Sequence, residues 1–296
     1  MRNATLLGSL LAAFILVFPS SINAQEEQEF AEDSTQYWTT TKSLGLNFSN
    51  VGLENWAGGG VSSIALGFIG QFKAVRESEK SIWTNQIDMA YGLQKQDGNE
   101  TFRKTDDQLI ITSQYGYRFS QEWFFSGELN FRTQMDNGYK YGVDDQGDET
   151  RTPISKVLAP GYLSLNLGIT FKKKKWLSLT LSPITNKNTL VLDDDLSDAG
   201  AFGVSPGSKI RSEFGTSFGG TTTVNIMKNV NFSSAFTLFS NYENPTTIDV
   251  NWETLISMKV NSYLNASFGT QLIYDEDVDV ERNDGTVGPA VQFRHA

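Results

Sequence analysis

Apolar and polar residues alternate along most of the chain from Leu44 onward. Between Leu163 and Phe171 every odd position is apolar and every even position is polar or glycine, and residues 177–182 repeat the pattern. An amphipathic helix would place its apolar residues three and four positions apart, whereas a strand with two different faces alternates with a period of two. The pattern therefore predicts β-strands.

The same alternation recurs along the chain, and no amphipathic helix of useful length lies between the repeats. Parallel strands need long crossover connections, so an antiparallel arrangement is expected. The fold class predicted is all-β, a transmembrane antiparallel up-and-down β-barrel of about twelve strands. The expected strands span residues 42–50, 61–74, 81–94, 106–119, 123–135, 162–173, 176–191, 210–226, 230–240, 247–260, 264–274 and 288–296.

The connections between these strands alternate between two classes. The first class is tight and polar, at 77–80, 120–122, 172–175, 228–229 and 261–262. The second is mostly longer and richer in aspartate and glycine, at 51–60, 95–105, 136–161, 192–209, 241–246 and 275–287. Bacterial outer-membrane barrels have short periplasmic turns and longer outer loops, so this alternation favours such a barrel.

The distribution of charge over the two strand faces supports the same interpretation. Alternate residues of each strand form two sets, one for each face of the sheet. In the central part of the strands, one set is apolar and contains no Asp, Glu, Lys or Arg. Its members include Leu66, Ile87, Ile111, Phe131, Phe218, Phe236, Trp252 and Leu272. The other set of alternate residues contains a candidate lumenal charge network: Lys73, Asp88, Arg118, Glu128, Arg132, Glu213, Asp249, Glu253 and Lys259. A charge facing lipid at mid-membrane costs about 2–4 kcal/mol, so a barrel keeps its outer face uncharged.

A soluble β-sandwich is the main alternative, because it also keeps charges off its buried face. Soluble strands average about five or six residues, shorter than most of those expected here. Aromatic residues also gather where strands meet the tight turns, as in a membrane interface, although hairpin packing would explain them too. They are Trp83, Tyr117, Phe119, Trp123, Trp176 and Phe232.

The N-terminus has the features of a secretory signal peptide. Arg2 is followed by an apolar run from Leu6 to Phe18 and by small residues ending at Ala24. A membrane anchor is the alternative, but the run is shorter than the roughly 20 residues that a bilayer requires. We expect a signal peptide at 1–24, an acidic extension at 25–37 and the barrel at 38–296.

Composition narrows the chemistry further. The absence of cysteine excludes disulfides and thiolate sites, and a single histidine, His295, excludes a zinc site built from several imidazoles. A net charge of -10 argues against nucleic-acid binding. The mean hydropathy of -0.31 resembles that of a soluble protein, but alternating strands with a polar lumen and acidic loops produce the same value.

Several segments resemble one uncharacterised Bacteroidota family, the domain of unknown function number three-zero-seven-eight. They are LNFSNVGLENWAGGG (46–60), YGLQKQDG with FRKTDD (91–107), LSPIT (181–185), DAGAFGVSPGSKIRSEFG (198–215), NYENPTTIDVNWE (241–253) and LIYDEDV (272–278). The resemblance implies an outer-membrane barrel of undetermined activity. Family members continue to a last strand with an aromatic end, whereas this chain stops at Ala296, so the C-terminal strand is expected to be incomplete.

Three functions remain open from the sequence. The leading one is a small passive channel or transport-associated pore, with lumenal charges that select the permeant species. The second is a structural or adaptor barrel with a lumen closed by ion pairs and with outer loops that bind a partner or a glycan. The third is a lipid- or glycan-modifying enzyme, disfavoured because such hydrolases usually activate their nucleophile with a histidine and His295 lies at the end of the chain.

The acidic outer loops are the last candidate feature. Their carboxylates could bind Ca²⁺, but none matches the EF-hand pattern, and a solvated acidic surface is the simpler interpretation. They comprise Asp144, Asp145, Asp148, Glu149, Asp193, Asp194, Asp195, Asp198, Asp275, Glu276, Asp277, Asp279, Glu281 and Asp284. No cofactor, catalytic residue or resident metal is predicted. The expected partners are outer-membrane lipids and lipopolysaccharide, with an outer-membrane partner protein left open.

Overall fold

The computed structural model describes residues 38–99, 101–174, 176–261, 264–282 and 285–295. All of them belong to one compact unit of the chain, 33–296. The expected signal peptide and the acidic extension before residue 38 lie outside the described residues. Among the residues described, no helix is long and apolar enough to cross a membrane.

Twelve strands form one antiparallel sheet in which every strand pairs with the next long strand along the chain. The strands are β1 (Thr39–Val51), β2 (Ser63–Glu77), β3 (Ser81–Gln96), β4 (Arg103–Arg118), β5 (Trp123–Thr133), β8 (Gly161–Lys173), β9 (Leu177–Leu190), β10 (Ile210–Met227), β11 (Val230–Asn241), β12 (Asp249–Lys259), β13 (Asn265–Tyr274) and β16 (Gln292–His295). This confirms the predicted all-β, up-and-down class and the number of strands. Short and long connections alternate between the strands, as the sequence indicates.

The long connections contain structure of their own. A hairpin of β6 (Gly138–Val143) and β7 (Glu149–Ser155) lies between β5 and β8, and a second hairpin of β14 (Asp279–Glu281) and β15 (Val287–Pro289) lies between β13 and β16. The connection from β9 to β10 contains the short helices α1 (Asp194–Asp198) and η1 (Ala201–Gly203).

The expected last strand, 288–296, is wrong in its first half. Residues 287–289 pair instead with 279–281, and only Gln292–His295 reach the main sheet. The Arg282 side chain donates a hydrogen bond to the Pro289 carbonyl (2.7 Å), which helps to hold these residues in the local hairpin. Local pairing across a short turn therefore replaces part of the expected strand.

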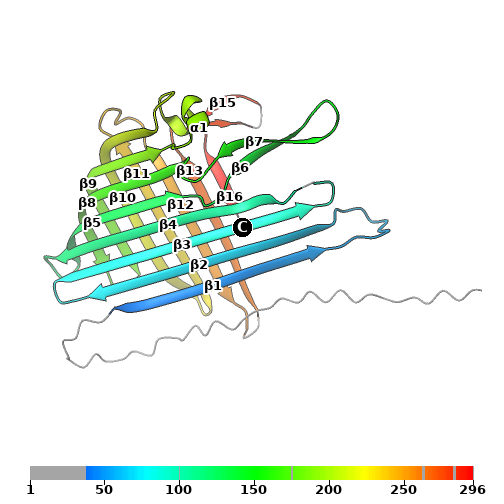
Figure 1. Ribbon diagram of the computed structural model, residues 1–296. Helices are drawn as coiled ribbons and strands as arrows, with labels where there is room; N and C mark the ends of the chain where they lie inside the picture. The colour runs from blue at the N-terminus through cyan, green and yellow to red at the C-terminus, as the bar shows by residue number, and fades with distance from the viewer. Residues whose placement is uncertain (1–37, 100, 175, 262–263, 283–284, 296) are drawn as a thin grey trace, which may run out of the picture. The chain divides into compact units, whose positions relative to one another are not determined.

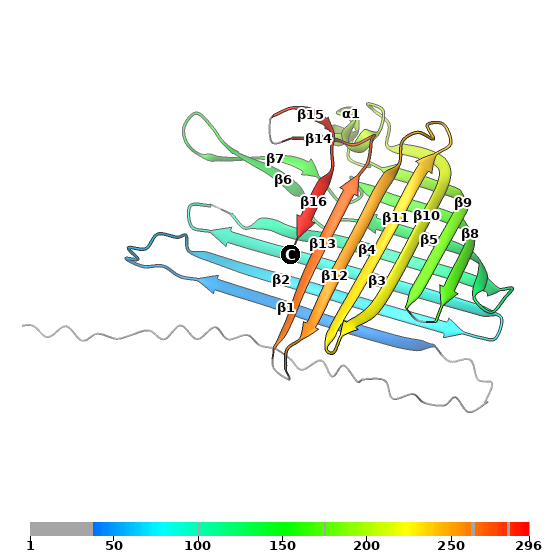
Figure 2. The ribbon, with the colours of Figure 1, turned by 180° about the vertical axis from the view of Figure 1, so that it is seen from behind.

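The sheet is not closed in the described part of the chain. β1 and β16 are its two edges, and β16 pairs with β13 over four residues. The sheet nevertheless curves strongly: β1–β4 lie in front in Figure 1, and β10–β13 lie in front when the molecule is seen from behind in Figure 2. One ion pair joins these halves, from Arg294 on β16 to Asp106 on β4 (2.9 Å).

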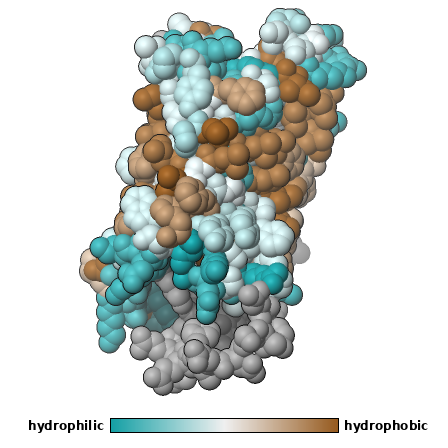
Figure 3. Space-filling model, turned by 90° about the vertical axis from the view of Figure 1, so that its left-hand side faces the viewer, coloured by the Kyte–Doolittle hydropathy of each residue, from teal (hydrophilic) through white to brown (hydrophobic). Residues whose placement is uncertain are grey.

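The register places the predicted apolar residues on one continuous face, called here the outer face. Phe72 pairs with Ile87, Ile87 with Ile111, and Ile111 with Phe131. Further along the sheet, Phe236 on β11 pairs with Trp252 on β12, and both residues belong to the same outer face. In Figure 3 hydrophobic side chains form a band on the face in view, with hydrophilic side chains above and below.

A bulge interrupts this alternation on β9. Leu167 pairs with Ile184 but Ile169 pairs with Leu181, so the intervening residues, which include Pro183, fall out of register. Proline has no N–H to donate to a sheet, and a bulge accommodates it. The freed Ser182 carbonyl accepts hydrogen bonds from the hydroxyls of Thr185 (3.2 Å) and Thr216 (3.3 Å).

The buried apolar cluster of the described residues is small and lies in the connections, while Phe124 on β5 and Phe239 on β11 are buried separately within the sheet. Ala159, Val191 and Val204 are almost completely buried, and Leu196 and Phe202 pack against them. The residues come from the β7–β8 and β9–β10 connections. The fold therefore exposes its apolar sheet face and buries apolar side chains where the long connections meet.

Candidate functional site

The inner face of the curved sheet lines a polar cavity of about 630 Å³. Gln71, Lys73 and Gln108 contribute from β2 and β4. Glu253 and Gln271 contribute from β12 and β13, on the other half of the sheet. Amides, hydroxyls and a few charges therefore face this space, together with the apolar residues Ala90, Ala235 and Leu255.

All nine residues of the candidate lumenal charge network lie on the inner face by register. The register partners that fix this placement include Gln71 for Asp88, Gln114 for Glu128 and Gln271 for Glu253. The structure does not bring the nine together into one network. They divide into separate groups with different partners.

Two of the carboxylates are bound by neutral amides. Asp88 accepts hydrogen bonds from the side chains of Gln71 (2.7 Å) and Gln86 (2.8 Å). Glu253 accepts one from Gln271 (2.8 Å). An amide satisfies the carboxylate oxygens without cancelling the negative charge. Neither hydrogen-bond set therefore supplies a positive charge to these carboxylates.

Glu128 and Arg132 are partnered in the same way. Gln114 (3.1 Å) and Asn166 (3.3 Å) donate to Glu128, and Arg132 donates to Gln108 (3.2 Å). The two charges lie four residues apart on one strand, but their hydrogen bonds run to amides on neighbouring strands. A lumen closed by ion pairs is one of the expectations from the sequence. At Glu128 and Arg132 the structure instead has carboxylate–amide and guanidinium–amide hydrogen bonds.

Of the remaining cations of the network, Arg118 and Lys259 lie away from these groups, whereas Lys73 pairs in register with Gln86. Arg118 forms an ion pair with Glu77 (3.2 Å) and stacks over Phe124 (5.2 Å) near the short connections. Lys259 is exposed at the same end of β12, and Lys73 lines the cavity.

Glu213 and Asp249 belong to a compact group that also contains residues outside the predicted network. The Nζ atom of Lys187 on β9 lies 2.5 Å from Asp249 Oδ2, 2.9 Å from Asp275 Oδ2 and 3.8 Å from Glu213 Oε2. Arg211 completes the group on β10. We call Lys187, Arg211, Glu213, Asp249, Asp275 and Asp277 the mouth cluster.

Arg211 connects the mouth cluster to the turn after β13. Its Nη2 atom lies 3.1 Å from Glu213 Oε2 and its Nη1 atom lies 3.2 Å from Asp277 Oδ2. Asn241 donates a further hydrogen bond to Glu213 Oε1 (3.3 Å). The Glu213 side chain is only 5% exposed, so its charge depends on these partners.

Sequence reasoning missed Lys187 and Arg211 for different reasons. In residues 177–182 the odd positions are apolar and lie on the outer face. If this alternation continued, Lys187 would also lie on the outer face, but the register shift at the bulge turns it inward. Pro183 within the strand was the signal for that shift. Arg211 follows the regular parity of β10, and the charge pattern alone would have found it.

Three segments that carry the family resemblance meet at the mouth cluster. The segment 198–215 supplies Arg211 and Glu213, the segment 241–253 supplies Asn241 and Asp249, and the segment 272–278 supplies Asp275 and Asp277. Residues that are far apart in the sequence therefore converge at one end of the inner face.

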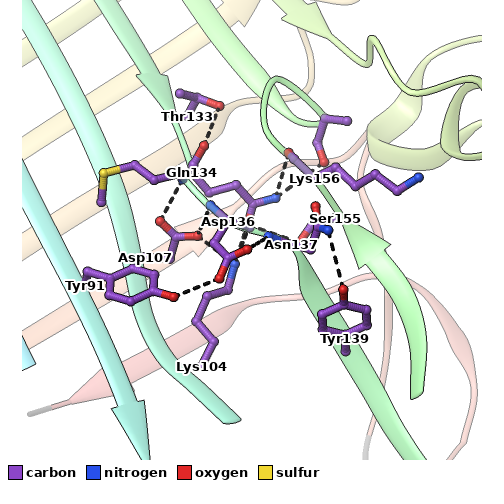
Figure 4. Close-up of polar contacts among 12 residues, drawn as sticks. Tyr91, Lys104, Asp107, Thr133, Gln134, Asp136, Asn137, Tyr139, Ser155 and Lys156 are labelled. Carbon is purple, nitrogen blue, oxygen red and sulfur yellow. Dashed lines mark hydrogen bonds and ion pairs between the residues drawn. The ribbon is translucent and has the colours of Figure 1, made fainter. Parts of the chain in front are cut away.

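A second polar group ties the β6–β7 hairpin to the sheet (Figure 4). Asp107 on β4 accepts hydrogen bonds from the backbone N–H groups of Met135 (2.7 Å) and Asp136 (2.9 Å). Lys104 donates to Asp107 (2.6 Å) and to the Asp136 carbonyl (2.8 Å). The Tyr91 hydroxyl donates to the Asp136 carboxylate (2.7 Å), and this bond lowers the pKa of Asp136 below its usual value.

Gln134 extends this group toward the next strand. Its amide donates to the Lys156 carbonyl (3.1 Å), and its side-chain oxygen accepts from Ser155 (3.0 Å) and Lys104 (3.2 Å). The two ends of the long β5–β8 connection are therefore fixed to each other and to β4.

Several acidic loop residues have structural partners. Asp144 accepts the backbone N–H groups of Gln146 and Asp148, both at 2.9 Å, and so closes a turn. Asp193 caps the N-terminus of α1 and forms an ion pair with Lys156 (2.5 Å). In the described part of the chain, no group of three or more acidic or histidine side chains is arranged to hold a metal ion.

His295 lies on β16, borders the cavity and has its ring 6.1 Å from the ring of Phe293. Its backbone pairs with Thr270 of β13. By register His295 shares the outer face with Phe293, which pairs with Leu272, whereas Arg294, which pairs with Gln271, faces inward.

Comparison with known families gives one match. The profile of a family described as "Protein of unknown function (DUF3078)" matches residues 48–139. The match runs from the end of β1 into β6, and it confirms the resemblance for that part of the chain. No curated protein matches the sequence.

Proposed function

We propose that this chain is an outer-membrane β-barrel that forms a passive pore for small polar solutes. The observation that carries the proposal is the polar cavity of about 630 Å³ on the inner face of a sheet whose outer face is apolar. A protein folded in water would place these two surfaces the other way round.

Exposure of the outer face supports a lipid environment. Phe214 is 61% exposed, Phe125 54% and Trp252 48%, although all three lie within strands. Soluble monomers rarely expose large contiguous apolar patches, while a lipid-facing sheet requires one. Apart from β16, the strands of the main sheet contain 10–18 residues, and a tilted strand needs about 9–11 to cross a bilayer.

The connections support an orientation within the membrane. In outer-membrane barrels the short turns lie on the periplasmic side and the long connections outside. The two hairpins, α1 and the mouth cluster would then lie at the outer end. A secretory signal at the N-terminus would deliver the chain to the periplasm, from which barrels insert.

The lining of the cavity supports a pathway for polar solutes more than a lumen closed by ion pairs. Gln71, Gln86, Thr221 and Ser233 present amides and hydroxyls to the space, which can replace part of the hydration of a solute. Asp88 accepts hydrogen bonds from two neutral amides instead of from a cation.

Conductance in planar bilayers tests the proposal. We expect discrete conductance steps from the folded full-length chain, and their absence would contradict a pore. The chain contains no cysteine, so Lys73→Cys in the cavity lining can be labelled alone with a charged methanethiosulfonate. Labelling should reduce the conductance of Lys73→Cys but not that of a Ser78→Cys control in the turn after β2.

A structural barrel with a closed lumen is the second candidate, and the mouth cluster is the observation that favours it. Its ion pairs join β9, β10, β12 and the turn after β13 at one end of the inner face. A well-folded chain that does not conduct and that co-purifies with a stoichiometric partner would support this candidate over the pore.

A further inference from the structure

The outer face of the sheet carries a hollow of about 380 Å³ that extends over β9, β10, β11 and β12. Gly220, Thr222 and Ser234 line it and have small side chains or none. Larger neighbours, among them Phe236 and Trp252, stand around them. The volume is within the range of about 300–1,000 Å³ that is usual for small-molecule sites.

The register of the strands explains the wall of the hollow. Gly220 pairs with Leu179 on one side and with Phe236 on the other. A Cβ atom at Gly220 would lie 2.7 Å from both the Leu179 Cδ2 atom and the Phe236 Cε1 atom. Gly220 therefore allows these two side chains to approach each other over β10. The Trp252 indole donates to the Ser234 hydroxyl (2.9 Å), so this hydroxyl lies on the outer face and fixes the ring beside the hollow.

A basic residue stands at one end of the hollow. Lys173 on β8 pairs with Leu177 on β9, which lines the hollow and pairs in turn with Thr222. Lys173 lies two positions after Phe171, and Phe171 pairs with Leu179, so both side chains lie on the outer face. Lys173 is exposed and is the last residue of β8, at the end of the sheet with the short connections. The apolar hollow is therefore bordered by a positive charge at that end.

This arrangement matches the two parts of an anionic phospholipid. A lysine on a lipid-facing surface is tolerated near the headgroups, where its ammonium group can reach phosphates. Because Lys173 ends its strand, the hollow would lie directly below the headgroup level, at the depth of the acyl chains. In the proposed orientation the short connections face the periplasm, so the lipid would come from the leaflet on that side.

We propose that the hollow binds one acyl chain of an anionic phospholipid and that Lys173 binds the phosphate of the same lipid. The inference rests on the proposed membrane barrel, because the outer face meets lipid only there, but it does not require a conducting lumen. A second copy of the chain is the competing occupant. The described strands have no Asp or Glu in the central part of the outer face, so a second copy packed over the hollow would offer Lys173 no counter-charge.

Native mass spectrometry tests the contact with the headgroup. The folded chain, released from micelles that contain equal amounts of phosphatidylglycerol and phosphatidylcholine, should retain one phosphatidylglycerol. Lys173→Gln should lower this preference about fivefold. Lys80→Gln is the matched control, since it removes an exposed charge in the short connection between β2 and β3, at the same end of the sheet. Equal retention of the two lipids, or equal losses in the two variants, would overturn the assignment.

Filling the hollow tests the contact with the acyl chain. Ser234→Leu should lower retention of phosphatidylglycerol several-fold. Ser113→Leu on β4 is the matched control, because Ser113 also accepts a hydrogen bond from an outer-face tryptophan, Trp83 (3.0 Å), but does not line the hollow. Equal retention by the two variants would contradict binding in the hollow. A lipid-independent dimer that is lost in Ser234→Leu would assign the hollow to a second copy and overturn the proposal.

Quenching by brominated lipids tests the site in a chain with an unfilled hollow. The emission of Trp252 is obtained as the difference between the unaltered chain and Trp252→Phe. Phosphatidylglycerol with brominated acyl chains should quench this emission more strongly than brominated phosphatidylcholine at the same mole fraction. Equal quenching by the two lipids would overturn the preference for an anionic lipid.

Conductance separates failure of the lipid site from failure of the pore. Lys173 lies on the outer face, so Lys173→Gln should leave the conductance steps unchanged. A chain that retains phosphatidylglycerol but never conducts would overturn the pore and support the lipid site. A conducting chain without a lipid preference would overturn the lipid site alone.

Discussion

Lys187 on β9 forms its shortest ion pair with Asp249 on β12, at 2.5 Å, although two strands lie between them in the sheet. Such a contact is possible only because the sheet curves enough for inner-face side chains to meet across its concave side. Asp275 and Glu213 approach the same ammonium group. Lys187 therefore connects distant strands through a single side chain.

Replacing Lys187 should destabilise the fold. Lys187→Met leaves Asp249 and Asp275 close together without their central cation, and removal of one partner from a largely buried pair costs about 3 kcal/mol. Urea unfolding of the protein in detergent measures this loss. The double variant Lys187→Met with Asp249→Leu should recover part of the stability, and a single variant as stable as the unaltered chain would contradict the prediction.

A pair of neighbouring substitutions tests whether the outer face of the sheet faces lipid, as the proposed barrel requires. Phe236 pairs with Trp252 on the outer face, and Thr237 pairs with Asn251 on the inner face. Phe236→Lys should cost about 2–4 kcal/mol on folding into lipid vesicles because its charge faces hydrocarbon, while Thr237→Lys should cost much less. Similar losses for the two variants would argue against a membrane-facing outer side.

The alternation of residues was sufficient to predict the strands, their order and the two faces. It failed where local chemistry interrupts the period of two. The bulge at Pro183 reverses the facing of Lys187, and the pairing of 287–289 with 279–281 removes half of the expected last strand.

The mouth cluster was only partly predictable for a related reason. Glu213 and Asp249 follow from strand parity, but their meeting with Asp275 depends on the curvature of the sheet and on the course of a long connection. A period of two along a strand carries no information about which distant strands face each other. Amide partners such as Gln71 were equally hidden, since glutamine on a polar face is not distinctive.

The anchor of the β6–β7 hairpin gives a prediction about loop order. Asp107→Ala leaves the N–H groups of Met135 and Asp136 without their acceptor, and each unsatisfied group that stays out of water costs about 1–3 kcal/mol. Limited proteolysis between residues 136 and 155 should become faster. Asp106→Ala, which removes the neighbouring inner-face ion pair with Arg294, is the matched control and should leave the cleavage rate unchanged.

The ion pair between Lys156 and Asp193 makes the start of the β9–β10 connection sensitive to acid. The hydrogen bond from Lys156 lowers the pKa of Asp193 below its usual value, and the backbone N–H of Leu196 acts in the same direction. A depressed carboxylate pKa stabilises the folded state above the unfolded pKa of about 3.9, and this contribution is lost as the pH falls through the folded value.

Amide exchange of α1, measured from pH 6 downward and corrected for the intrinsic rate, should therefore show protection that falls once the pH drops below about 4. Asp193→Asn keeps an oxygen to cap the helix but has no titratable charge, so its protection should start lower and lack this step. The same acid step in Asp193→Asn would assign the loss to other carboxylates. Protection that rises on acidification would reverse the sign and contradict the stabilising role of the pair.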